Sequence, residues 1–231
     1  MLTFKPHQAL GHIQKYLPNN PIIIEAGAYD GRETLRMATL WPQGTIHTFE
    51  PVPELFEKLK QNTAHLPHVR CYPMALGDTT GTATLYISEK PTKPGKASQA
   101  NSLLKPDKRL ELSPLIFPRT IQVPTITIDD WAKRYEIDHV DFLKLDIQGY
   151  ELNVMKACPL ILANVKVILT EVEFVSAYEG QYLYADVKSW LEQQGFTMIG
   201  KDFIDDIDWF FGNILLVRPF TAFRADSAAN P

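Results

Sequence analysis

The chain alternates between short apolar runs and amphipathic segments. Most of the apolar runs are rich in β-branched and aromatic residues, which favours strands, and several are apolar almost throughout. Such runs are typical of strands buried on both faces of a parallel sheet. The predicted strands occupy residues 21–26, 45–50, 69–75, 140–146, 165–172, 196–200 and 211–217.

Helical patterns separate these runs. Residues 53–62 place Leu55 and Leu59 on one face, and residues 187–194 follow the same spacing before Gly195. Because strands and helices alternate along the chain, the pattern predicts a doubly wound α/β domain with right-handed crossovers.

Two segments, 82–88 and 120–127, depart from this rhythm and predict an added pair of antiparallel strands. The stretch between them, residues 89–119, is rich in proline, lysine and serine and is locally basic. It is interpreted either as a solvated loop or as a lid over an anionic or sugar substrate.

Composition narrows the class of protein. A length of 231 residues suits one large domain, and the net charge of −4 argues against a broad basic face for nucleic acid. Cys71 and Cys158 cannot form a disulfide framework, so we expect the reducing cytoplasm. We find neither an apolar run of about 18 residues nor a signal-peptide pattern. No heptad pattern indicates an oligomeric state.

Candidate chemistry begins where the first two predicted strands end. The first is followed by EAGAYDG, residues 25–31, and the second ends at Glu50, where an acidic side chain can bind a ribose diol. The glycine spacing is not the GxGxxG of dinucleotide sites, and the carboxylates of Glu25 and Asp30 would repel phosphate. They suit the amino group and sulfonium of S-adenosylmethionine. A tight strand–helix turn with no ligand is the plainer alternative.

Carboxylates also end the later strands. Asp146 closes one strand, and alternation places Glu171 and Glu173 on one face of the next. Burying such a pair is costly, which favours a functional role. The plainer alternatives are that Asp146 caps the following helix and that Lys144 or Lys166 neutralises the pair.

The motifs EAGAYDG, TFEPVPE, MALGD and DFLKLDIQGYEL together resemble those of FkbM-type S-adenosylmethionine-dependent methyltransferases. The resemblance spans roughly residues 21–218, including the closing GNILLVRP. It implies a class I methyltransferase fold, a Rossmann-like doubly wound sheet of seven mostly parallel strands with the last antiparallel. We therefore expect an N-terminal helical extension (1–20), a methyltransferase domain (21–219) with an insertion at about 82–127, and a flexible tail (220–231).

The strand-end residues and the resemblance together give the candidate site residues. Those expected to bind the cofactor are Glu25, Ala26, Gly27, Ala28, Tyr29, Asp30, Gly31, Glu50, Pro51, Ala75, Leu76, Asp78 and Asp146. Those expected to act in catalysis are Asp146 as the first candidate for general base, Glu173 as the second, and Gln148. Those expected to contact substrate are Ser102, Glu171, Tyr178 and Tyr182. The tyrosines are either a stacking wall for a sugar ring or core packing.

The predicted function is O-methylation of a carbohydrate or natural-product acceptor, with a small molecule or glycan rather than nucleic acid as partner. Asp146 with Glu171 or Glu173 could instead hold a divalent cation, which is less favoured because the ligand spacing is not diagnostic. A nicotinamide-dependent oxidoreductase is disfavoured by the missing GxGxxG. Many family members carry Glu at the position of Gln148, and a neutral amide cannot act as a base. A non-catalytic binding protein of the same fold therefore stays open.

Overall fold

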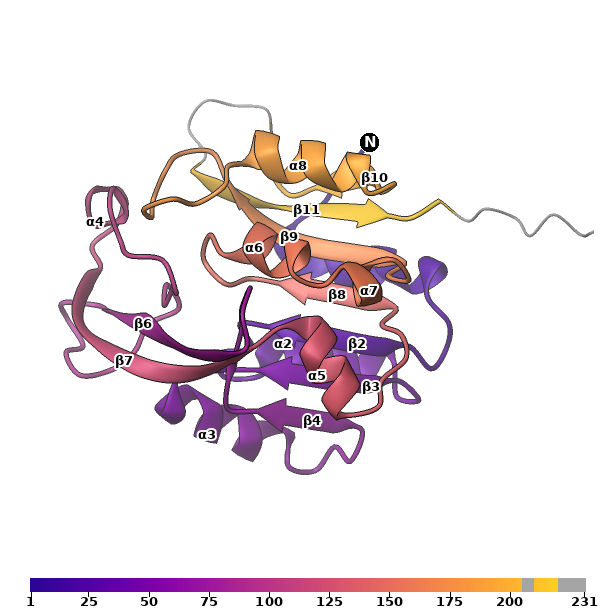
Figure 1. Ribbon diagram of the computed structural model, residues 1–231, viewed down its shortest axis with the longest axis horizontal. Helices are drawn as coiled ribbons and strands as arrows, with labels where there is room; N and C mark the ends of the chain where they lie inside the picture. The colour runs from indigo at the N-terminus through magenta and orange to yellow at the C-terminus, as the bar shows by residue number, and fades with distance from the viewer. Residues whose placement is uncertain (205–209, 220–231) are drawn as a thin grey trace, which may run out of the picture.

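The computed structural model describes residues 1–204 and 210–219, and its main feature is an eight-stranded sheet (Figure 1). The order across the sheet is β1-β10-β11-β9-β8-β2-β3-β4. The strands are β1 (Leu2–Thr3), β2 (Ile22–Ala26), β3 (Thr45–Phe49), β4 (Val69–Tyr72), β8 (Phe142–Leu145), β9 (Val167–Glu173), β10 (Thr197–Lys201) and β11 (Phe211–Val217).

The pairing confirms the predicted sheet. Strands β4, β3, β2, β8 and β9 run parallel, and β11 lies antiparallel between β9 and β10. The prediction of seven strands is wrong by one, because Leu2 and Thr3 pair with the outer edge of β10. Both residues of this strand are exposed, so no apolar alternation marks it in the sequence. The following residues, Pro6–Tyr16, form short helical turns.

Helices cover both faces of the sheet (Figure 1). One buried cluster packs α5, α6, α7 and α8 on one face, and a second packs α1 and α2 on the other. The helices are η1 (Pro6–Gln8), α1 (Ala9–Ile13), η2 (Gln14–Tyr16), α2 (Arg32–Leu40), α3 (Pro53–Thr63), α4 (Arg109–Leu112), α5 (Ile128–Arg134), α6 (Glu151–Lys156), α7 (Pro159–Leu162) and α8 (Tyr184–Gln193).

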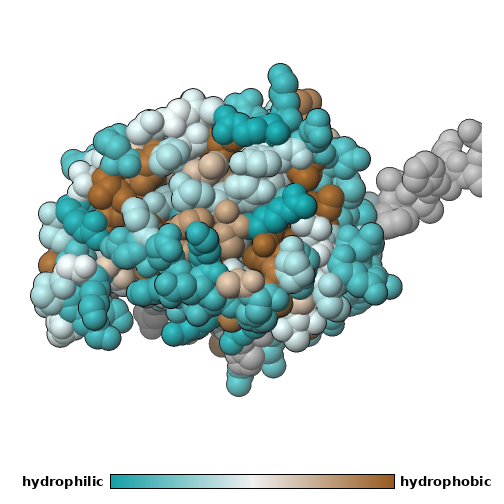
Figure 2. Space-filling model, turned by 90° about the horizontal axis from the view of Figure 1, so that it is seen from below, coloured by the Kyte–Doolittle hydropathy of each residue, from teal (hydrophilic) through white to brown (hydrophobic). Residues whose placement is uncertain are grey.

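Apolar side chains are largely collected in these clusters. The face of the molecule in Figure 2 is mainly hydrophilic, with hydrophobic side chains in separate patches. Among the helices that the structure describes, none combines the length and the apolar content needed to cross a membrane.

A smaller sheet, in the order β5-β7-β6, leans over the carboxyl edge of the main one (Figure 1). Its strands are β5 (Ala75–Leu76), β6 (Gly81–Glu89) and β7 (Ile116–Ile126). The antiparallel pairing of β6 with β7 was predicted from their alternation. The segment between β6 and β7 forms isolated antiparallel β-bridges from Ser102 to Tyr86 and from Pro106 to Tyr178. These bridges hold the insertion against the rest of the domain. The tail predicted for residues 220–231 lies outside the described residues.

Candidate active site

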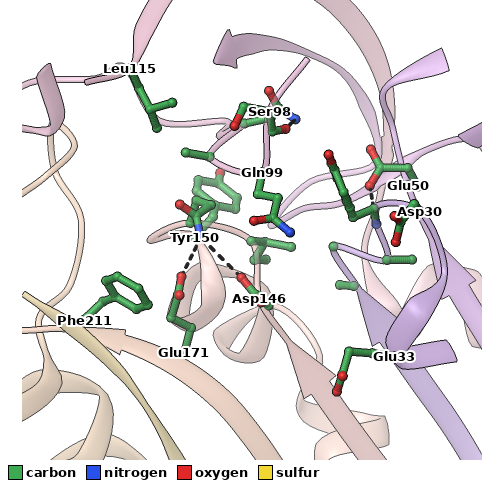
Figure 3. Close-up of a pocket in the computed structure, with 18 of the residues that line it drawn as sticks. Asp30, Glu33, Glu50, Ser98, Gln99, Leu115, Asp146, Tyr150, Glu171 and Phe211 are labelled. Atoms are coloured by element: carbon green, nitrogen blue, oxygen red, sulfur yellow. Dashed lines mark hydrogen bonds between the residues drawn. The ribbon is translucent and has the colours of Figure 1, made fainter. Parts of the chain in front are cut away.

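A cavity of about 950 Å³ opens where the parallel strands end, beneath the insertion (Figure 3). Strand β2 has β3 on one side and β8 on the other, so the sheet order reverses here, which is where open α/β sheets bind ligands. Of the predicted residues, the ones that line the cavity are Glu25, Ala26, Gly27, Ala28, Tyr29, Asp30, Glu50, Pro51, Ala75, Leu76, Asp146, Gln148, Glu171 and Glu173.

The turn after β2 lies directly against the end of β8. Gly27 has φ +80°, and a Cβ atom there would stand 1.9 Å from the backbone oxygen of Asp146. No side chain fits at this position, so glycine allows the turn to touch the strand that carries the candidate base. Gly31 begins α2 with φ +84° but does not line the cavity.

Glu50 links this turn to the end of β3. Its Oε2 accepts the backbone N–H of Tyr29 at 2.9 Å, and its Oε1 accepts that of Val52 at 2.9 Å (Figure 3). Burial raises the pKa of Glu50 to about 7. Each carboxylate oxygen keeps a second lone pair, so Glu50 can shape the turn and accept hydrogen bonds from a ligand at once.

Glu25 lies deeper than the sequence suggests. It is fully buried and accepts the hydroxyls of Thr34 at 2.5 Å and Thr48 at 3.1 Å, with Lys144 Nζ at 3.5 Å. Burial raises its pKa. Lys144 thus pairs with Glu25, and Lys166 pairs with Asp141 at 2.7 Å, so the alternative in which either lysine neutralises Glu171 and Glu173 is wrong.

Near the ends of β8 and β9, the cavity holds a group of carboxylates around one amide. Gln148 Nε2 donates to Asp146 Oδ1 at 3.3 Å and to Glu171 Oε2 at 2.7 Å (Figure 3). Glu173 accepts a hydrogen bond from Gln181. The alternative in which Asp146 caps α6 is also wrong, because Tyr150 is the N-cap residue and no side-chain cap bond forms.

Burial is the main cause of the raised pKa values of two carboxyls in this group. It raises the pKa of Glu171 well above its ordinary value, and the negative charges of Asp146, Glu151 and Glu173 raise it further. The pKa of Glu173 is also raised, chiefly by burial. Both shifts favour the protonated forms of these carboxyls relative to an exposed carboxyl.

Three of the four residues predicted to contact substrate do not line the cavity. Ser102 is buried, and its hydroxyl donates to the backbone oxygen of Gln148 at 2.8 Å. Tyr178 is fully buried, with its hydroxyl 3.2 Å from the oxygen of Ala100. Tyr182 packs against the core under the ammonium of Lys156. For these tyrosines the core-packing alternative is the one that the structure bears out.

Asp78 is likewise not a wall residue. It lies near Tyr150, which lines the cavity and whose pKa is raised to about 12, first by burial and then by Asp78. Wall residues that sequence reasoning missed include Gln99 and Leu115 of the insertion, Tyr150 and Phe211 (Figure 3). Tyr150 belongs to the motif DFLKLDIQGYEL but was not singled out within it. No motif marks Gln99, Leu115 or Phe211, because the path of the insertion and the return of β11 decide which of their side chains reach the cavity.

The raised pKa values predict how the free energy of unfolding depends on pH. Burial raises the pKa of Glu151 to about 8, and the backbone N–H of Ile147 donates to its carboxyl. A carboxyl with a higher pKa in the folded state binds more protons there than in the unfolded state, so stability falls as pH rises. Between pH 6.5 and 8.5 we expect Glu151 to lower the free energy of unfolding by about 2 kcal/mol.

Urea unfolding of the ligand-free protein across this range measures the effect. His47, whose pKa burial lowers to about 4, is neutral in both states over most of the range and contributes little. Glu151→Gln keeps an acceptor for Ile147 and should reduce the slope, and Glu50, whose pKa burial raises to about 7, contributes part of the slope that remains. A wild-type protein that becomes more stable towards pH 8.5 would contradict the prediction.

Comparison with known families gives a match over most of the chain. A family described as the methyltransferase FkbM domain matches residues 25–198. The 2-O-methyltransferase NoeI of Sinorhizobium fredii is 27% identical over 163 residues, covering 70% of this chain and 67% of NoeI. The methyltransferase sdnD of Sordaria araneosa is 26% identical over 211 residues, covering 79% of this chain and 76% of sdnD.

Solved structures share the fold at low sequence identity. An rRNA methylase from Streptococcus thermophilus superposes with a TM-score of 0.54 at 10% identity, covering 94% of this chain and 98% of that one. A Methylobacillus flagellatus structure described as methyltransferase FkbM gives 0.53 at 13% identity, covering 86% of this chain and 44% of that one. A Streptococcus mutans protein in complex with S-adenosylhomocysteine gives 0.51 at 11% identity, covering 95% of this chain and all of that one.

Proposed function

Because this chain belongs to the methyltransferase FkbM family, we propose that it transfers the methyl group of S-adenosylmethionine to a hydroxyl oxygen of a carbohydrate or natural-product acceptor. The chain is a methyltransferase with the class I fold. The proposal adds the acceptor class and the role of each residue.

One observation carries the proposal. A single cavity brings Glu50, from the end of β3, and Asp146, from the end of β8, to opposite sides of the turn that follows β2. Glu50 retains acceptor capacity for the two hydroxyls of a ribose, and the acidic turn favours a cationic ligand. S-adenosylmethionine supplies both groups, a ribose diol and a sulfonium that makes its methyl carbon electrophilic.

The protein's part in the reaction is to align and deprotonate the acceptor. Asp146 stands beside the turn, and its carboxylate can accept the proton of the acceptor hydroxyl as the new oxygen–carbon bond forms. Glu171 also lines the cavity and can hydrogen-bond to a neighbouring hydroxyl of the acceptor. Glu173 is the weaker candidate for the base, because it lies on β9, whereas Asp146 follows β8, the strand against which the turn after β2 packs.

A sugar or another polyhydroxylated molecule matches the polar lining of the cavity near the ends of β8 and β9. Asp146, Gln148 and Glu171 offer both acceptors and donors, and Phe211 adds an aromatic ring to the wall. The net charge of −4 supports a small acceptor in preference to nucleic acid. We also expect the protein to act in the cytoplasm.

Thermal unfolding tests the cofactor. A ligand present at 100 times its dissociation constant adds about 2.7 kcal/mol to the stability of the folded state. We expect S-adenosylhomocysteine to raise the melting temperature, and NADH to leave it unchanged. A shift with NADH but none with S-adenosylhomocysteine would contradict the proposal.

Labelled S-adenosylmethionine then tests the acceptor. We expect label to pass to one or more members of a panel of methyl glycosides, oligosaccharides and hydroxylated polyketides. An RNA oligonucleotide serves as the contrasting acceptor. Transfer to the RNA alone would overturn the proposed acceptor class and leave the methyltransferase activity in place.

A further inference from the structure

The side-chain amide of Gln148 stands between the carboxylates of Asp146 and Glu171 (Figure 3). Its nitrogen is 3.3 Å from one carboxylate oxygen and 2.7 Å from the other, so those two oxygens lie no farther apart than the sum of these distances. Two acidic groups this close inside a protein require a shared proton, a bound cation or hydrogen-bond donors between them. The amide supplies the donors.

The surrounding structure fixes which way this amide faces. Gln148 has φ +57°, and its backbone oxygen accepts the hydroxyl of Ser102 at 2.8 Å. Its Oε1 lies 3.4 Å from the hydroxyl of Tyr178, which can donate to it. Turning the amide over would place Oε1 where Nε2 now stands, 2.7 Å from a carboxylate oxygen of Glu171, so the hydrogens face the carboxylates.

The same place would suit a divalent cation if the amide were absent. Hard divalent cations take carboxylate oxygens as ligands, and one ion commonly bridges carboxylates from neighbouring elements. Among the residues that the structure describes, no three His, Cys, Asp or Glu side chains gather as a metal-ligand set. Asp146 and Glu171 are two potential ligands, and the third position is filled by an amide with its hydrogens turned inward.

We propose that Gln148 stands in for a bridging divalent cation, so that its amide holds Asp146 and Glu171 in place for the acceptor without a metal ion. Gln148 is then a positioning residue, and the insertion orients it through Ser102. The part of this inference that concerns the acceptor rests on the proposed function. The part that concerns cation exclusion does not, and it can be tested with no acceptor at all.

Titration of the protein with Mn²⁺, followed by isothermal calorimetry at pH 7.5, tests the exclusion. Gln148→Glu replaces the two donors with a third carboxylate and should bind one Mn²⁺ at least tenfold more tightly than the wild type. Gln181→Glu is the matched control, because Gln181 donates to Glu173 in the same part of the site. It makes the same chemical change beside one carboxylate only, and it should leave Mn²⁺ binding near the wild-type level.

A second variant guards against misfolding of the first. Gln148→Ala removes the donors without adding charge, and it should also bind Mn²⁺ more tightly than the wild type. The inference is overturned if the wild type binds Mn²⁺ as tightly as Gln148→Glu, or if neither variant gains affinity. Thermal unfolding of the same samples with S-adenosylhomocysteine separates the two proposals. If S-adenosylhomocysteine fails to raise the melting temperature of the wild type, the cofactor assignment is contradicted and the Mn²⁺ comparison is unaffected.

Discussion

Glu50→Gln is expected to weaken the binding of S-adenosylhomocysteine by about 100-fold or more, since hydrogen bonds to a charged group contribute about 1.5–3 kcal/mol each. The wild-type carboxylate accepts from Tyr29 and Val52 and retains lone pairs for a ribose diol. An amide has one oxygen in place of two, and its NH₂ group would face a backbone N–H. The variant therefore loses ligand hydrogen bonds and leaves a donor of the turn unsatisfied.

The pH dependence of binding gives this prediction a second readout. Burial raises the pKa of Glu50 to about 7 in the ligand-free protein, and a ribose diol binds best to the ionised form. Affinity of the wild type should rise from pH 6 to pH 8, and this rise should disappear in Glu50→Gln. Calorimetric titration at both pH values measures each effect.

Glu54→Gln is the matched control. Glu54 lies four residues further along, pairs with Arg119 at 2.6 Å, and does not line the cavity. It should bind S-adenosylhomocysteine as the wild type does. Equal affinity in Glu50→Gln and Glu54→Gln would remove Glu50 from the cofactor site.

The part of the cavity around the turn after β2, where we propose that the cofactor binds, was predictable because its residues are local in sequence. Gly27, with its positive φ, and Glu50, at the next strand end, follow from the strand–turn–helix pattern and the rule that ligands bind at the carboxyl edge. The sheet was predictable for the same reason. The strand β1 was not, because its two exposed residues gain their place only from the free edge of β10.

The part of the cavity around Gln148, where we propose that the acceptor binds, was less predictable because it depends on contacts between distant segments. The position of Gln148 was recognisable, but its role depends on Glu171, which lies on a neighbouring strand, and on Ser102 in the insertion. Tyr178 is the clearest example of a residue whose role could not be predicted from the sequence. Its sequence context fits a stacking wall and core packing equally well, and only the fold turns its ring inward.

Asp146→Asn is expected to slow methyl transfer by about 10²- to 10⁴-fold, which is the range for loss of a general base. Its amide oxygen can still accept from Gln148, and Gly27 touches only the backbone of residue 146, so the variant should keep its fold and bind S-adenosylhomocysteine within about threefold of the wild type. Single-turnover transfer from labelled S-adenosylmethionine, with an acceptor from the panel, measures the rate.

Two further variants make the assignment of the base specific. Asp138→Asn changes an exposed carboxylate that does not line the cavity, and it should transfer at the wild-type rate. Glu173→Gln should slow transfer far less than Asp146→Asn, because Glu173 lies on β9, one strand further than β8 from the turn after β2 where the cofactor is expected. Wild-type turnover in Asp146→Asn would exclude it as the base, and a large loss in Glu173→Gln alone would transfer that role to Glu173.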